Sequence, residues 1–244
     1  MSRYQAFLIH LGISLVIFVI LAAIIFYWWY LGIFFETDGG WQGIRIIALV
    51  DLVLGPCLTL VVFKAGKPGL KFDLTAIGLF QAICLAGGTW VVHSERPIAM
   101  VMVDDIFYRM SGDDYRDARI EPPNLQQFEG RGPKWVTVQL PKDFTELGDI
   151  RSRSIVADTP LRILHDRYIP FEVAHLDVER STPEADLVKL DIQTGEIPQW
   201  LERHGGSLED YSFYPLGTRY EFVHLGIDKK SGKIVGMLPT PIPE

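Results

Sequence analysis

The chain has 244 residues, and its 23 Lys and Arg against 30 Asp and Glu give a formal net charge of -7. Its hydrophobic fraction of 48% and charged fraction of 22% are ordinary for a soluble protein, but they average two unlike parts. Residues 1–92 carry five Lys or Arg and four Asp or Glu, which leaves 18 basic and 26 acidic residues for the other 152. This acidic second part argues against nucleic acid binding through a basic surface.

The first apolar segment covers residues 6–30 and contains no charged side chain. About 20 apolar residues cross a bilayer, whereas the apolar part of a signal peptide has only about 7 to 15 and precedes a small-residue cleavage site. This segment ends instead in the aromatic run Phe26–Tyr30, which is typical of a membrane interface. We therefore expect an uncleaved transmembrane helix.

Two further apolar segments, residues 43–63 and 72–92, predict three transmembrane helices within a membrane domain of residues 1–94. The alternative is that one of the three is a buried helix of a globular core. In the multi-pass interpretation the remaining residues, 95–244, form a separate domain.

The loops between these segments predict the orientation. The second loop contains Lys64, Lys67 and Lys71, whereas the first is acidic through Glu36 and Asp38. Because short basic loops stay in the cytoplasm, we expect a cytoplasmic N-terminus. Everything after the third segment then lies across the membrane, which in a bacterium is the periplasm, and the protein belongs to the inner membrane.

Asp51 is an ionisable residue inside the second segment. A charge at bilayer depth costs about 2.5 kcal/mol or more and normally faces protein or a water-filled cavity. Pro56, one turn below, predicts a kink, and Gly55 permits close approach of another helix. Two interpretations stay open: Asp51, Gly55 and Pro56 form a docking site for a partner helix, or Asp51 belongs to a polar clamp that holds the three helices together.

His10 lies about six residues into the first segment, level with Thr59 and not with Asp51. It is a second candidate partner-binding residue, with a hydrogen-bonded structural histidine as the alternative. Together the candidate site is His10, Asp51, Gly55 and Pro56.

The second domain, residues 95–244, is predicted to be α+β. Strands are expected over Ile98–Val103 and Trp135–Leu140, and a hairpin is expected from Tyr220–Ile227 and Lys233–Leu238 around a Gly-containing turn. Short helices are expected over Thr159–Arg167 and Pro183–Asp191, and a better defined one over Ile197–His204, which Gly205 and Gly206 end.

No established catalytic or cofactor motif occurs in this domain. Its histidines are scattered singly, which predicts no zinc site. Asp104-Asp105 and Asp113-Asp114 are paired acids, but adjacent strand residues point to opposite faces, so a solvated acidic surface is the favoured interpretation. We expect no enzyme activity, no cofactor and no metal.

Three stretches of the first part are distinctive: MSRYQAFLIHLGIS at residues 1–14, DLVLGPCLTLVVFK at residues 51–64 and KFDL at residues 71–74. Together they resemble the TfpX/TfpZ family of type IV pilin accessory proteins. The match is looser in the second domain, at Arg96-Pro97, at Tyr214–Leu216 and at Asp228–Gly236.

The resemblance implies a non-enzymatic, chaperone-like protein of the inner membrane that assists the stability or assembly of a cognate major pilin. Major pilins keep an apolar helix in the membrane, with a glutamate near its inner end, and a head in the periplasm. The implied partners are this pilin, membrane lipid and, as a further candidate, the pilus assembly machinery. On this hypothesis His10 lies at the depth of the pilin glutamate, and Gly55 and Pro56 shape a groove for the pilin helix.

Two other functions are considered. A membrane-bound transferase that modifies pilin is the main alternative, although such enzymes usually have more membrane helices and an acidic or histidine motif at a membrane face. A sensor is disfavoured because the inner side offers only the N-terminus and one short loop.

Overall fold

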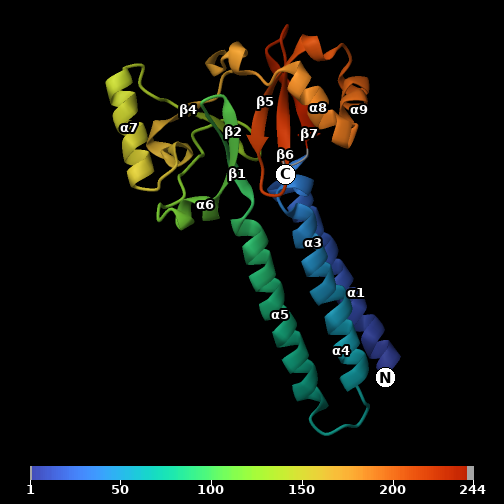
Figure 1. The fold of residues 1–244 in the computed structure, drawn as a ribbon. Coiled ribbons are helices and arrows are strands. Elements are labelled where there is room, and N and C mark those ends of the chain that lie inside the picture. Colours follow the sequence, from blue (N-terminus) through green and yellow to red (C-terminus); the bar gives the residue numbers. More distant parts are fainter. Residues whose placement is uncertain (1, 241–244) are drawn as a thin grey trace. The chain divides into compact units, whose positions relative to one another are not determined.

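The computed structural model describes residues 2–240 and divides into two compact units, Met1–Arg96 and Pro97–Glu244. The first unit consists of three long apolar helices, and the second is an α+β domain with a seven-stranded sheet (Figure 1). The predicted fold class, three membrane-spanning helices followed by an α+β domain, is confirmed at this level.

Each of the three helices is long and apolar enough to cross a membrane, and they cover Arg3–Trp29, Gly40–Val62 and Leu70–Ser94. The first is helix α1 (Arg3–Ile24) continued by a π-helical turn (Ile25–Trp29). The second is α3 (Gly40–Ala48), a π-helical turn (Leu49–Leu54) and α4 (Gly55–Val62), and the third is α5 (Leu70–Ser94). A short helix, α2 (Phe34–Thr37), lies in the first loop.

The surface of this unit is apolar. Leu8, Val61, Phe72 and Ile83 are each more than 60% exposed. Exposed apolar area of this extent marks a surface that contacts lipid or protein. The few buried polar residues therefore stand out, and Ser14, Asp51, Thr59 and Gln81 are all less than 7% exposed.

The sheet of the second unit has the strand order β4-β3-β1-β2-β5-β6-β7. The strands are β1 (Pro97–Val103), β2 (Ile106–Ser111), β3 (Lys134–Val138), β4 (Tyr168–Pro170), β5 (Tyr211–Gly217), β6 (Phe222–Asp228) and β7 (Lys233–Thr240). Neighbouring strands are antiparallel except β1 with β3 and β2 with β5, which are parallel.

The helices of this unit are α6 (Gly112–Asp117), α7 (Phe144–Val156), α8 (Glu184–Thr194) and α9 (Glu196–His204). Helices α8 and α9 pack on the β5–β7 end of the sheet through Leu187, Ile197 and Trp200 (Figure 1). A second cluster, which includes Val101, Met110 and Val136, forms the core at the β1–β3 end.

Most predicted elements of this domain are present. Strands β1, β3, β6 and β7 and helices α8 and α9 lie where the sequence placed them, and Gly205 and Gly206 after α9 have φ of 78° and 70°. The single short helix expected over Thr159–Arg167 is not formed, although part of this range is helical in 3₁₀ form. The chain forms two short 3₁₀ turns there, Leu161–Ile163 and His165–Arg167, separated by Leu164 at φ -70° and ψ 68°.

Strand β2 is not among the strands expected from the sequence, where the strand Ile98–Val103 ends just before Asp104 and Asp105. They are instead the two-residue turn of the β1–β2 hairpin, since Val103 pairs with Ile106. Both have positive φ, 53° and 64°, as the favoured hairpin turn requires. Aspartate tolerates this conformation better than most residues, although asparagine and glycine are the usual signals.

Candidate functional site: a polar cluster among the membrane helices

Two hydrogen bonds join the first and second membrane helices. His10 Nδ1 lies 2.6 Å from Thr59 Oγ1, and Ser14 Oγ donates to Asp51 Oδ1 at 3.2 Å. His10 and Ser14 are four residues apart, so they share one face of α1. The sequence placed His10 level with Thr59, and the contact between their side chains confirms this shared depth.

The Asp51 carboxyl group receives a second hydrogen bond from the third helix. Gln81 Nε2 donates to Asp51 Oδ1 at 3.1 Å, so this one oxygen connects all three helices. The other oxygen, Oδ2, is buried and has no hydrogen-bond partner among the described residues. Both donors are neutral, and Asp51 forms no ion pair within the part of the chain that the structure describes.

Asp51 lies in a π-helical turn. Pro56 leaves the backbone carbonyl of Asp51 without its usual donor within the helix. The Gly55 amide donates to the carbonyl of Val50, a π-helical bond five residues back. In the same register the Asp51 carbonyl would accept from residue 56, but proline has no amide hydrogen. Gln81 Nε2 approaches the Asp51 carbonyl at 3.5 Å instead. The kink expected at Pro56 stays a prediction; what the structure shows is a π-helical turn over Leu49–Leu54, a feature often found at functional positions.

Gly55 provides the space for Gln81. A Cβ atom at residue 55 would lie 2.0 Å from Gln81 Nε2 and 2.2 Å from its Cδ. Gly55 and Pro56 are both buried. Asp51, Gly55, Pro56 and Gln81 are therefore interdependent. Gly55 leaves room for the Gln81 side chain, Pro56 leaves the Asp51 carbonyl without a donor, and Gln81 bonds to Asp51.

These contacts describe the polar clamp that the sequence left open as one of two interpretations. Asp51, Gly55 and Pro56 are buried, whereas His10, hydrogen-bonded to Thr59, is half-buried. Asp51 and Gly55 both lie against Gln81. Their contact with a partner stays a prediction. Sequence reasoning missed Ser14 and Gln81, although an amide in the middle of an apolar helix is itself a signal for interhelical hydrogen bonding.

An apolar groove of about 770 Å³ lies between α1 and α5. Neither Gly55 nor Pro56 lines it, and a groove for a partner helix at those two residues stays a prediction. Its α5 wall includes small side chains, and Trp29 and His93 meet at one end with ring centroids 4.9 Å apart. The lining residues are Ile17, Ile20, Leu21, Trp29, Ala82, Leu85, Ala86, Thr89, Trp90 and His93.

The acid pairs of the second domain each have separate partners. Arg151 donates to both carboxylate oxygens of Asp104 at 2.7 and 2.9 Å. Asp105 Oδ1 accepts from the Asp177 amide at 2.8 Å. Neither acid pair forms a joint site.

In α6, Arg116 pairs with Asp113, while Arg109 pairs with Asp114 at 2.8 Å. Within residues 2–240 no group of three His, Cys, Asp or Glu side chains is arranged to hold a metal ion.

Comparison of the chain with protein-family models, with curated proteins and with solved structures found no match.

Proposed function

We propose that this protein is a non-enzymatic accessory protein of a type IV pilus, which holds the apolar helix of a cognate pilin in the membrane before assembly. The observation that carries this proposal is the apolar groove between α1 and α5. The resemblance of residues 1–14 and 51–64 to pilin accessory proteins supplies the identity of the occupant.

The groove suits a helix because its α5 wall contains Ala82, Ala86 and Thr89. Helices associate in lipid mainly through close packing, and small residues let two backbones approach. The polar clamp supports this role, since hydrogen bonds from Ser14 and Gln81 to one Asp51 oxygen hold the two walls of the groove on the central helix.

The proposal includes an orientation. The basic loop with Lys64, Lys67 and Lys71 stays in the cytoplasm, and residues 97–244 lie in the periplasm, where the pilin head is located. Reporter fusions after residue 66 and after residue 230 test it. Phosphatase activity from the second fusion alone is expected, and activity from the first would contradict the orientation.

Filling the groove tests the proposed function. Ala86→Phe places an aromatic ring on the groove wall, and we expect it to reduce pilin co-purification and surface pili. Ile83→Phe is the matched control, because Ile83 is on the same helix, is 64% exposed and does not line the groove. Equal pilin recovery with both variants, each present at normal level, would contradict helix binding in the groove.

The mass of mature pilin separates this function from that of a transferase. An accessory protein leaves the mass of pilin unchanged when it is deleted, whereas loss of a modifying enzyme lowers it by the transferred group. We expect identical masses with and without the protein.

A further inference from the structure

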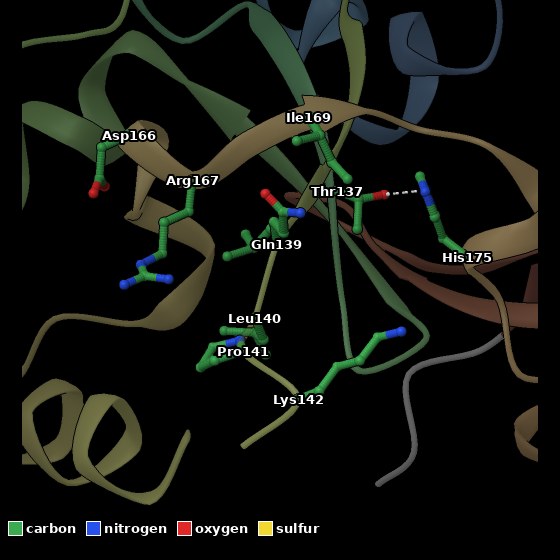
Figure 2. A pocket seen from close by; sticks show the side chains of 10 residues that line it. Thr137, Gln139, Leu140, Pro141, Lys142, Asp166, Arg167, Ile169 and His175 are labelled. Atoms are coloured by element: carbon green, nitrogen blue, oxygen red, sulfur yellow. Dashed lines mark hydrogen bonds between the residues drawn. The ribbon is translucent and has the colours of Figure 1, made fainter. Parts of the chain in front are cut away.

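A cavity of about 850 Å³ lies in the second domain, beside the β3–β4 edge of the sheet (Figure 2). Thr137 and Ile169 are paired across β3 and β4. The pairing continues beyond the strands, since the Gln139 amide donates to the Arg167 carbonyl at 2.8 Å. These backbone contacts fix the segments 137–142 and 166–169 next to each other, and both line the cavity.

Three basic side chains surround this cavity. Figure 2 shows Arg167 on one side of Gln139 and Lys142 with His175 on the other. His175 is positioned by its Nδ1, which accepts from the Glu172 amide at 3.1 Å and lies 3.4 Å from Thr137 Oγ1.

The charge of the cavity differs from that of its domain. Residues 97–244 hold 17 basic and 25 acidic residues, a net charge of -8. The acid of the cavity, Asp166, lies beyond Arg167 in Figure 2, on the side away from Lys142. A basic site within an acidic domain concentrates positive potential at one place.

Among the described residues, Arg167 and Lys142 also form weaker ion pairs, or none, compared with other cations of the domain. Arg151 and Arg109 form ion pairs of 2.7 and 2.8 Å. Arg167 instead reaches its acidic neighbour Glu146 only at 4.0 Å, and Lys142 forms no hydrogen bond or ion pair within residues 2–240. Their charges remain available to a ligand.

The cavity offers donors above all. Lysine and arginine side chains donate and do not accept, and the side-chain amide of Gln139 adds a further donor. Such a set recognises oxyanions, and arginine in particular matches the geometry of carboxylate and phosphate. Leu140, Pro141 and Ile169 supply an apolar wall for a carbon skeleton, and the volume is that of a small-molecule site. We propose that this cavity binds a small organic molecule that carries carboxylate or phosphate groups.

Equilibrium dialysis of the full chain in an uncharged detergent tests this site, with labelled inorganic phosphate and labelled citrate as probes. We expect saturable binding of at least one probe, one per chain, with a Kd of about 1 mM or lower. Lys142→Met and Arg167→Met should each weaken it about tenfold, because each removes a charged hydrogen-bond donor to the anion. Tighter binding of phosphate or of citrate identifies the anionic group.

Two further variants keep the test independent of folding. Gln139→Glu places a carboxylate between Arg167 and Lys142 without removing either cation, and it should abolish anion binding. Because residue 139 is exposed, this change should not impair folding. Lys189→Met removes a lysine of α8 that is 73% exposed and should leave Kd unchanged. Absence of saturable binding of both probes up to about 10 mM, or equal loss of binding in Lys189→Met, would overturn the proposal. Pilin recovery plays no part in this readout.

Discussion

The side chain of Gln81 lies where a Cβ atom of residue 55 would be, with its Nε2 2.0 Å from that position. A contact this short means that any side chain at residue 55 displaces Gln81. Gln81 donates to both the carboxyl group and the backbone carbonyl of Asp51. The hydrogen bonds from Gln81 of the third helix to Asp51 of the second therefore require a glycine at residue 55.

Gly55→Ala is expected to destabilise the membrane unit. Overpacking costs about 1 to 3 kcal/mol, and displaced Gln81 also loses its bonds to Asp51. Unfolding of the full chain in detergent by increasing dodecyl sulfate measures the change. Gly78→Ala is the control, because a Cβ there meets nothing within 4 Å. Equal unfolding midpoints for the two variants would contradict the role of Gly55.

Ser14 and Asp51 are expected to be energetically coupled. A double-mutant cycle with Ser14→Ala and Asp51→Ala should give a coupling energy of about 0.6 to 1.7 kcal/mol, as double-mutant cycles find for hydrogen bonds between membrane helices. Asp51→Asn retains an acceptor for Ser14 and Gln81 and should unfold closer to the natural protein than Asp51→Ala does. The same dodecyl sulfate titration provides the values. Additive effects of the two alanine substitutions would exclude a direct Ser14–Asp51 bond.

His224 predicts a loss of stability in acid. It is 8% exposed, and burial lowers the pKa of His224 from 6.5 to about 4. The unfolded chain therefore binds a proton that the folded chain does not between about pH 6.5 and pH 4, and the stability present above pH 6.5 is lost as the pH falls through this window.

The contribution of His224 is on the order of 3 kcal/mol by pH 4. His224→Leu should flatten the decrease of the thermal midpoint of the second domain between pH 7 and pH 4.5, even where its midpoint at pH 7 is lower. His165→Gln changes an exposed histidine and should retain the full decrease. An unchanged slope in His224→Leu would assign the pH dependence to other groups.

The bond between Asp104 and Arg151 is expected to hold helix α7 in place. Helix α7 has no buried residue, so little packing fixes it. Arg151→Ala should increase amide hydrogen exchange throughout Phe144–Val156, since weakly packed elements open locally. Arg153→Ala is the control, because this arginine of the same helix pairs, among residues 2–240, only with Asp149 of α7. Equal exchange in both variants would show that the Asp104 contact is dispensable.

The sequence was sufficient for the membrane helices, because hydropathy and length are local properties. It also identified Asp51, since an ionisable residue in an apolar segment is conspicuous. It could not pair Asp51 with Ser14 and Gln81, which are 37 and 30 residues away. The three helices are apolar on all sides, so the sequence does not show which of their faces pack together. For the same reason the groove between α1 and α5 could not be predicted.

The missed elements of the second domain have local reasons. Strand β5 contains Pro215, which argues against a central strand. The structure accommodates it because β5 pairs with β2 only at Leu216 and Gly217. Helix α7 buries none of its apolar residues, so the usual hydrophobic pattern is weak. Its one clear signal was Asp143, whose carboxylate accepts from the Thr145 and Glu146 amides as a helix cap.

The parallel pairing of β2 with β5 determines when the domain can close during synthesis. Strand β2 is complete at Ser111, but its second neighbour arrives only when Leu216 and Gly217 have been made. Until then the early hairpin presents an open edge, and open edges invite pairing with other chains. A chain that ends before residue 216 would thus be a membrane-anchored fragment in which one edge of β2 is unpaired. Such a fragment is expected to aggregate and to be a substrate for cellular proteases.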